Sequence, residues 1–209
     1  CDDVFYYLTM GNENYVMPER RTRATTEGIM KGLYLFKAAS QPLAQVTLLG
    51  SGSIMTAVLV AQSVLESTYN ISTAVWSATS YQQLRRDALE TDRENRLSPD
   101  KPLKPNYIET CFNNNADSIY IAASDNMKVV SDQISSWVPG GLVSLGTDGF
   151  GRSATREQLR RYFEVDTGHI VYTALYQLYR RGTVDYKTLA HAMQAYDITT
   201  DKPHGSMII

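Results

Sequence analysis

The chain has 209 residues, of which 43% are hydrophobic and 20% are charged, so it can bury a core and is not a disordered polymer. Lys and Arg number 20 and Asp and Glu 22, a net charge of −2. That balance argues against a nucleic-acid-binding surface, which needs a basic surplus. No apolar run approaches the roughly 18 residues that span a bilayer. We therefore expect neither nucleic acid nor a membrane as a partner.

The cysteines and the first residue bear on compartment and processing. Two cysteines, Cys1 and Cys111, are too few for a disulfide framework, which favours a reducing compartment such as the cytoplasm. Because the chain starts with Cys1 and not Met, we expect that it has been processed or shortened. A lipid-anchored N-terminus is the alternative, but the strand-like stretch Val4–Met10 follows almost at once and leaves no tether.

Three segments come before any regular alternation of elements. Val4–Met10 is rich in β-branched and aromatic residues, which predicts a buried strand. Residues 11–26, with one proline and three arginines, are typical of an exposed connector. Thr26–Lys37 predicts a short helix, although Gly28 and Gly32 weaken it.

From residue 46 onward, strands, small-residue turns and amphipathic helices alternate. The proline-rich stretch 98–105 interrupts this series, and a short helix or edge element is expected at 107–112. The alternation predicts an α/β fold in three layers, a mostly parallel sheet covered by helices on both faces. The expected pairs are a strand at 46–49 with a helix at 54–68 capped by Ser53, a strand at 74–78 with a helix at 81–96 capped by Ser80, a strand at 118–123 with a helix to Trp137 capped by Ser124-Asp125, and a strand at 142–145 with a helix to Tyr162, followed by two helices opened by Asp166 and Asp185.

The turn Gly50–Ser53 follows a strand and opens a helix, as a dinucleotide-binding loop does. Met55, however, stands where that motif has its third glycine. The next strand also ends in Ala78-Thr79-Ser80, without the acidic residue that holds a ribose hydroxyl. We interpret this stretch as a tight turn between a strand and a helix.

The most distinctive stretch is Gly146–Ser153, which has three glycines within six residues. Ser153 or Thr155 can cap the following helix, and Arg152 adds a positive charge near its N-terminus. The stretch lacks the Lys-Ser/Thr ending of a P-loop. We expect a structural or interface loop, with an anion pocket as the alternative. The candidate residues are Asp148, Gly149, Phe150, Gly151, Arg152 and Ser153.

The sequence offers few other candidates for catalytic or metal-binding side chains. His169, His191 and His204 form no i, i+4 pair and no Cys/His cluster, so we expect no metal site. His169 is interpreted as a packed or surface residue, and Cys111 as a buried small side chain. The paired arginines are interpreted as solvated faces or partner contacts and not as a nucleic-acid-binding stripe. We therefore expect no catalytic, cofactor-binding or metal-binding residue in this stretch.

Several stretches in their order resemble one family, the homodimeric thiamine-diphosphate-dependent pyruvate dehydrogenases, in their C-terminal, transketolase-like portion. The resemblance covers the chain from its first strand to about Lys202. The run Leu145–Ser153 is specific in this context, whereas the Gly50–Ser53 turn alone is weak. The stretches are Val4–Thr9, Asn12–Tyr15 with Met17-Pro18, Leu48–Ile54, Leu145–Ser153, Arg156-Glu157 and Phe163–Asp166.

That resemblance implies a C-terminal domain with a five-stranded mixed sheet, four strands parallel and one antiparallel. It implies that residues 1–42 are the last strand of a middle, pyrimidine-binding domain with a connector, and that residues 43–209 are the transketolase-like C-terminal domain. It also implies that thiamine diphosphate and magnesium bind elsewhere in a homodimeric enzyme, which decarboxylates pyruvate and acetylates the lipoyl group of an acetyltransferase partner.

Under that hypothesis this chain is an assembly domain that is catalytically silent by itself. Two alternatives stay open from the residues alone. One is a regulatory or anion-binding α/β module, and the other is the same domain from another 2-oxo-acid dehydrogenase or a transketolase.

Overall fold

The computed structural model describes residues 3, 5–8, 14–15 and 23–202. Five strands form one sheet in the order β1-β3-β2-β4-β5. β1 runs antiparallel to β3, and all other neighbours are parallel. The mixed, mostly parallel five-stranded sheet is thus confirmed. The strands are β1 (Leu33–Lys37), β2 (Val46–Gly50), β3 (Thr73–Ala78), β4 (Ile119–Ala123) and β5 (Leu142–Leu145).

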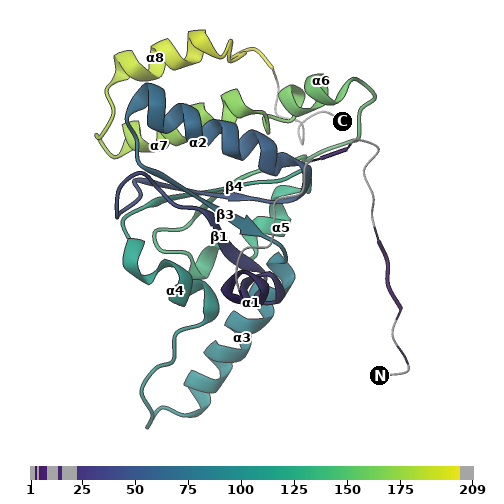
Figure 1. Ribbon diagram of the computed structural model, residues 1–209, viewed down its shortest axis with the longest axis vertical. Coiled ribbons are helices and arrows are strands. Elements are labelled where there is room, and N and C mark those ends of the chain that lie inside the picture. Colours follow the sequence, from purple (N-terminus) through teal and green to yellow (C-terminus); the bar gives the residue numbers. More distant parts are fainter. Residues whose placement is uncertain (1–2, 4, 9–13, 16–22, 203–209) are drawn as a thin grey trace.

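Helices cover both faces of this sheet (Figure 1). One apolar cluster joins the sheet to α2, α7 and α8, and a second joins the other face to α3, α4 and the segment around α5. This confirms the expected three-layer α/β/α arrangement. The helices are α1 (Arg23–Lys31), α2 (Met55–Tyr69), α3 (Tyr81–Leu97), α4 (Tyr107–Phe112), α5 (Lys128–Asp132), α6 (Arg156–Tyr162), α7 (Thr167–Arg180) and α8 (Tyr186–Ala195).

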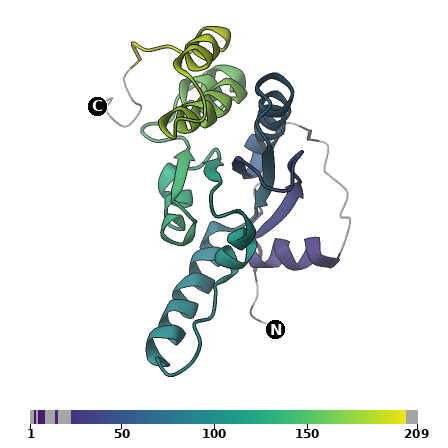
Figure 2. The ribbon, with the colours of Figure 1, turned by 90° about the vertical axis from the view of Figure 1, so that its left-hand side faces the viewer.

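The two central strands are buried on both faces, as their sequences require. Every residue of β2 and of β4 is buried, which is typical of parallel strands between two helical layers. Beyond the sheet, the distal part of α3 and the loop after it project from the domain (Figures 1 and 2). The carboxyl ends of β2, β3, β4 and β5 meet at one edge. In open α/β sheets, ligands bind in the crevices formed by the loops at this edge.

Three of the expected helix caps are present. Ser80, Asp166 and Asp185 each accept a hydrogen bond from the backbone N–H three residues later, which satisfies a donor that the helix leaves open. The prediction that Ser53 caps the helix after β2 is wrong, because α2 begins at Met55 and has no side-chain cap.

The expected helix after β4 is also shorter than predicted. α5 holds only Lys128–Asp132, and a 3-10 turn at Ser135–Trp137 follows it. Ser124 does not cap this helix; its hydroxyl accepts a hydrogen bond from Asn126 N at 3.2 Å. The apolar spacing correctly marked the buried Ile134, but spacing alone does not distinguish one long helix from two short turns.

The N-terminal prediction was partly wrong. The segment expected as one helix at Thr26–Lys37 contains the end of α1 and the edge strand β1, with Gly32 between them at φ +99°. A left-handed glycine is a common end for a helix. β1 therefore belongs to the sheet, although it lies within the expected connector.

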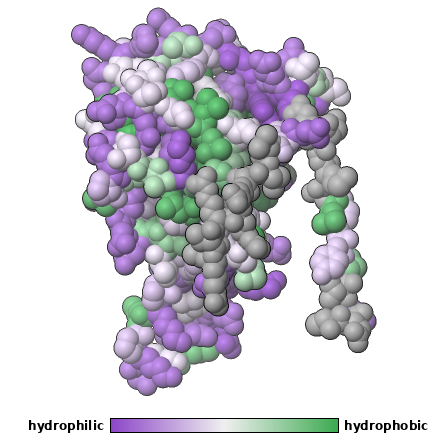
Figure 3. All heavy atoms as spheres, in the orientation of Figure 1, coloured by the Kyte–Doolittle hydropathy of each residue, from purple (hydrophilic) through white to green (hydrophobic). Residues whose placement is uncertain are grey.

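The first strand expected at Val4–Met10 is not formed in its described part. Residues 5–8 have no regular secondary structure, and their side chains are 80% to 91% exposed. In Figure 3 this stretch lies apart from the mainly polar face of the domain. The remaining residues of that stretch lie outside the described residues, and so do His204 and the end of the tail. The domain division at 42/43 stays a prediction.

Candidate functional site

The loop that follows β5 is held against the turn that follows β4. Gly146 lies so close to this turn that a Cβ would come within 2.5 Å of the Asn126 carbonyl oxygen. Thr147 donates from its backbone N–H to that same oxygen at 2.9 Å, and from its hydroxyl to Asp125 O at 2.8 Å. Glycine at position 146 is therefore required by a close backbone approach, as its place in the motif indicates.

The Asp148 carboxylate stabilises the loop. Its carboxylate accepts a hydrogen bond from Lys128 N at 3.0 Å, and the Lys128 ammonium group lies 4.0 Å away. The next residue, Gly149, has a φ of 92°, which turns the chain back over the sheet edge. Asp148 thus ties the loop to the start of α5 instead of offering a free carboxylate.

A cavity of about 320 Å³ lies beneath the loop. Of the six predicted residues, Gly149, Gly151 and Arg152 line it, together with Asp125 from the β4 side. We call it the β5-side cavity. The other three residues do not line it: Asp148 contacts Lys128, and the exposed side chains of Phe150 and Ser153 lie outside its lining.

Arg156 and Arg160 also line this cavity, and Arg160 belongs to one of the arginine pairs that the sequence analysis interprets as solvated faces or partner contacts. Arg160 donates to the Ser53 carbonyl at 3.4 Å and to the Ser53 hydroxyl at 3.3 Å. Arg156 and Arg160 both donate to the Tyr15 hydroxyl, at 2.8 and 3.4 Å. The missed signal was the spacing of Arg152, Arg156 and Arg160 at every fourth residue, which places the last two on one helix face.

The N-terminus of α6 is closed by its own side chains. Thr155, not Ser153, is the cap, and it forms a reciprocal capping box with Gln158. The helix has only seven residues. The Arg152 guanidinium lies 5.4 Å from the centre of the Tyr162 ring, a stacking contact that holds it over the loop. Positive charge in this cavity comes from arginine side chains and not from an open helix end.

His169 behaves as the packed residue that was expected. It is 8% exposed, and its Nδ1 lies 2.8 Å from Asp166 Oδ1. Partial burial raises the pKa of Asp166, but hydrogen bonds from the His169 ring and backbone N–H outweigh this, so the pKa is lowered from its ordinary value. Cys111 is half-buried with a free thiol, and burial raises its pKa. The contacts of His169 and Cys111 are those of side chains that support the fold.

The turn after β2 agrees with the interpretation of a tight connection. A Cβ on Gly50 would lie 2.9 Å from the Met55 sulfur, so Met55 fills the space where a dinucleotide would need the backbone open. Among the described residues, no group of three or more His, Cys, Asp or Glu side chains is placed to hold a metal ion.

Comparison with known proteins decides the family. The model of the transketolase-like TK C-terminal domain matches residues 32–166. The chain belongs to this family. It is 43% identical over 202 residues to the pyruvate dehydrogenase E1 component of Pseudomonas aeruginosa, and 40% identical over 202 residues to that of Escherichia coli K12. These alignments cover 96% of this chain but only 23% and 22% of those proteins.

Solved structures agree on the fold. Transketolase from Leishmania mexicana superposes with a TM-score of 0.51 at 19% identity, over 74% of this chain and 19% of that one. A transketolase from Pichia stipitis, in a complex with a sedoheptulose phosphate, gives 0.51 at 19% identity over 76% and 20%. The transketolase-like C-terminal fold that the resemblance implied is thereby confirmed. No helix among the described residues is long and apolar enough to cross a membrane.

Proposed function

We propose that this chain is the C-terminal domain of a pyruvate dehydrogenase E1 enzyme. The complete enzyme would decarboxylate pyruvate on thiamine diphosphate with magnesium and acetylate the lipoyl group of an acetyltransferase partner in the cytoplasm. The observation that carries this proposal is the 43% identity to an E1 component across 96% of the chain. Residues 1–42 would then end the preceding domain and residues 43–209 would form this one, with β1 added to its sheet from the connector.

The role proposed for the domain is assembly of a homodimer, with no chemistry of its own. Its carboxylates at the sheet edge serve the fold: Asp148 binds Lys128, and Asp166 caps α7 and contacts His169. In contrast, Phe150 is 74% exposed at the tip of a loop that is otherwise tied down. A large apolar side chain on a fixed loop is well suited to a protein interface.

A second candidate function is capture of an anionic metabolite in the β5-side cavity. The observation in its favour is the approach of Arg152, Arg156 and Arg160 to one space of about 320 Å³. Asp125 in the same lining offsets part of that charge, and two of the arginines already donate to Tyr15. Calorimetry with inorganic phosphate on the native chain and on Arg152→Ala tests this, since absence of binding to both would dispose of it.

The main proposal is tested in a chimera. The matching 202 residues of the Pseudomonas aeruginosa E1 component are replaced by this chain, and mass in solution and pyruvate-dependent acetyl transfer to a lipoyl acceptor are measured. We expect a dimer that is active, while the same protein without the region fails to assemble. Pyruvate turnover by the 209-residue chain alone would contradict the silent role. If the enzyme accepted another 2-oxo acid and not pyruvate, the proposed substrate would be wrong.

The interface role is tested by Phe150→Asp in that chimera. If the side chain packs against a second subunit, a buried charge there weakens association, and we expect the dimer to dissociate at about tenfold higher concentration. The matched control is Leu103→Asp, because Leu103 is also highly exposed, at 81%, but lies in the projecting loop after α3. Equal effects of both substitutions would count against a specific contact by Phe150.

A further inference from the structure

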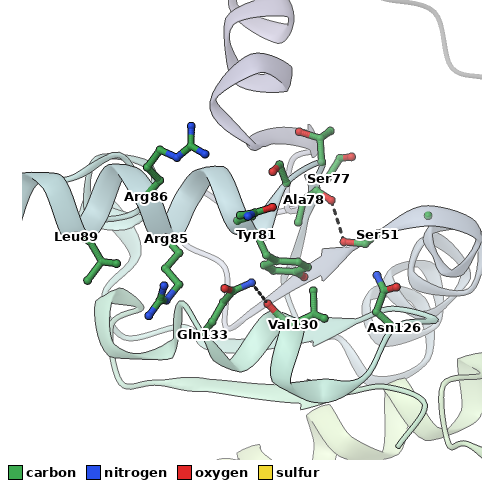
Figure 4. A pocket seen from close by; sticks show the side chains of 14 residues that line it. Ser51, Ser77, Ala78, Tyr81, Arg85, Arg86, Leu89, Asn126, Val130 and Gln133 are labelled. Atoms are coloured by element: carbon green, nitrogen blue, oxygen red, sulfur yellow. Dashed lines mark hydrogen bonds between the residues drawn. The ribbon is translucent and has the colours of Figure 1, made fainter. Parts of the chain in front are cut away.

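A larger cavity, of about 870 Å³, lies at the carboxyl ends of β2, β3 and β4. We call it the β3-side cavity (Figure 4). Its polar lining includes Ser51 after β2, Arg85 and Arg86 on α3, and Asn126 and Gln133 after β4. The volume lies in the range of ordinary small-molecule sites, which is about 300–1,000 Å³. The cavity is therefore large enough for a metabolite and not only for a single ion.

The sheet topology places this cavity where α/β domains open a crevice. The chain leaves β2 for α2 on one face of the sheet, and leaves the neighbouring strand β3 for α3 on the other face. The two connections diverge at the carboxyl ends of these adjacent strands, which opens a gap between them. Ser51-Gly52, from the first connection, and Ser77–Tyr81, from the end of β3 and the start of α3, both line it.

The charged side chains that line this cavity are both arginines. Arg85 and Arg86 lie at its rim and are exposed, and no carboxylate among the described residues lines it. The cavity also borders the first turn of α3, a helix of 17 residues. The Ser80 hydroxyl accepts a hydrogen bond from one N–H group of this turn, that of Gln83, and the other N–H groups of a first helical turn have no acceptor within the helix and carry a partial positive charge. The electrostatics favour an anion.

An independent observation comes from Tyr81, in that first turn. Its side chain is 4% exposed and lines the cavity, and Figure 4 shows its ring projecting from α3 toward Ser51 and Val130. Its hydroxyl makes no hydrogen bond of ordinary geometry among the described residues, although the Ser51 hydroxyl lies close enough to affect its pKa. The adjacent Ser51 hydroxyl donates to the Ala78 carbonyl at 2.8 Å. A buried hydroxyl without a partner is costly, and an acceptor on a bound ligand would relieve that cost.

The protonation state of Tyr81 suits a donor. Burial raises its pKa to about 12, with the Ser51 hydroxyl offsetting part of the rise. The phenol therefore keeps its proton at neutral pH. It can donate a hydrogen bond to an anionic oxygen without adding a negative charge of its own.

We propose that the β3-side cavity binds a small phosphate-bearing metabolite, with Arg85 and Arg86 engaging the phosphate and Tyr81 donating to one of its oxygens. Guanidinium groups match phosphate oxygens in bidentate geometry. The remaining volume, lined by hydroxyl and amide groups, accommodates the organic part of the ligand. This site is separate from the β5-side cavity and does not rest on the enzymatic assignment.

The proposal is tested by calorimetric titration of the 209-residue chain with inorganic pyrophosphate. We expect saturable binding of one equivalent, weakened about tenfold by either Arg85→Ala or Arg86→Ala, as the loss of a charged contact predicts. The matched control is Arg93→Ala, an exposed arginine of the same helix that does not line the cavity. Absence of saturable binding, or an equal loss in the Arg93 variant, would overturn the site.

The role of Tyr81 is tested separately with Tyr81→Phe. Because the hydroxyl has no partner, its removal should leave the unfolding temperature unchanged or raise it, while weakening pyrophosphate binding about fivefold. A lower unfolding temperature together with unchanged binding would show a purely structural hydroxyl and refute its part in the site. Amide chemical shifts supply the location: changes at Ser51, Ser80 and Asn126 are expected, and changes confined to residues 149–152 would overturn the assignment.

Discussion

Two cavities share the carboxyl edge of one sheet and differ in how their arginines are used. In the β5-side cavity, Arg156 and Arg160 already donate to Tyr15, and Asp125 supplies an opposing charge. In the β3-side cavity, Arg85 and Arg86 border a space without a carboxylate among the described residues, above a buried tyrosine hydroxyl that lacks a partner. The β5-side cavity thus has more arginines, but those of the β3-side cavity are more available to a ligand.

Positive charge near a glycine-rich loop therefore does not by itself indicate donors that are available to a ligand. What distinguishes the two places is whether the donors are already satisfied within the chain. On the β5 side, hydrogen bonds of Thr147 and Asp148 hold the start of the loop, and the arginines Arg156 and Arg160 donate within the chain. On the β3 side, the Tyr81 hydroxyl and the two arginines remain available as donors to a ligand. Substitutions on each side test this contrast.

The largest effect is expected at Gly32, which shapes the β3 side. Its carbonyl accepts hydrogen bonds from Thr79 and Ser80 just before α3. A Cβ at this left-handed residue would come within 2.5 Å of the Ser80 carbonyl oxygen. Gly32→Ala should lower the free energy of unfolding by about 3 kcal/mol, from strain and overpacking together. Urea denaturation measures it.

The control for that substitution is Gly182→Ala. Gly182 also has a positive φ, of 74°, but nothing lies within 4 Å of the added Cβ. Gly182→Ala should lower the free energy of unfolding by about 1 kcal/mol, from backbone strain alone. Equal losses at the two positions would mean that the close approach to Ser80 does not exist in solution.

On the β5 side, Gly146→Ala is the next largest change. The new methyl group would press on the Asn126 carbonyl oxygen and on Lys128 N, at 2.5 and 2.9 Å, and should cost about 2 kcal/mol. Gly151→Ala, with nothing within 4 Å, should change stability by less than about 0.5 kcal/mol. The pair is compared by thermal unfolding, and a reversed order would refute the tied-down loop.

Much of this fold follows from the sequence alone. The four strands from Val46 onward were predicted because parallel strands buried on both faces read as continuous apolar runs. β1 was missed, since Leu33–Lys37 is an edge strand that alternates between buried and exposed residues and directly follows a helix. Local pattern could not show that Gly32 ends that helix through contacts with Thr79 and Ser80, far along the chain.

The site was less predictable than the fold. The loop at 146–153 was marked as distinctive by its glycines, but Arg160 contacts Ser53, which lies 107 residues away in the sequence, only in the folded chain. The β3-side cavity gave no local motif either. Its lining comes from three separate connections, and an unsatisfied hydroxyl has no signature in a sequence.

A smaller effect is expected from acid. The pKa of Asp166 is lowered in the folded state, so its contribution to stability is present above the ordinary value of 3.8 and is lost as the pH falls through the folded value. Asp166→Asn keeps a capping oxygen but removes this titration. Between pH 5 and pH 2 the variant should lose less stability than the native chain. Parallel acid unfolding curves for both would refute the role of the His169 contact.

The smallest effect is expected from Arg152→Ala. Its guanidinium stacks on Tyr162 at an exposed position, which is worth about 0.5 kcal/mol. Thermal unfolding should show a loss near this size, and Tyr162→Leu should abolish the difference between Arg and Ala at position 152. A loss of several kcal/mol would mean that Arg152 supports the loop through contacts other than this ring.

The central claim is that this domain completes an E1 enzyme without performing its chemistry. The most direct measurement is the rate of pyruvate decarboxylation by the Pseudomonas aeruginosa chimera, with the isolated 209-residue chain assayed beside it under saturating thiamine diphosphate and magnesium. The account predicts turnover by the chimera and none by the chain alone. A chimera that assembles as a dimer but cannot decarboxylate pyruvate, or an isolated chain that can, would contradict it.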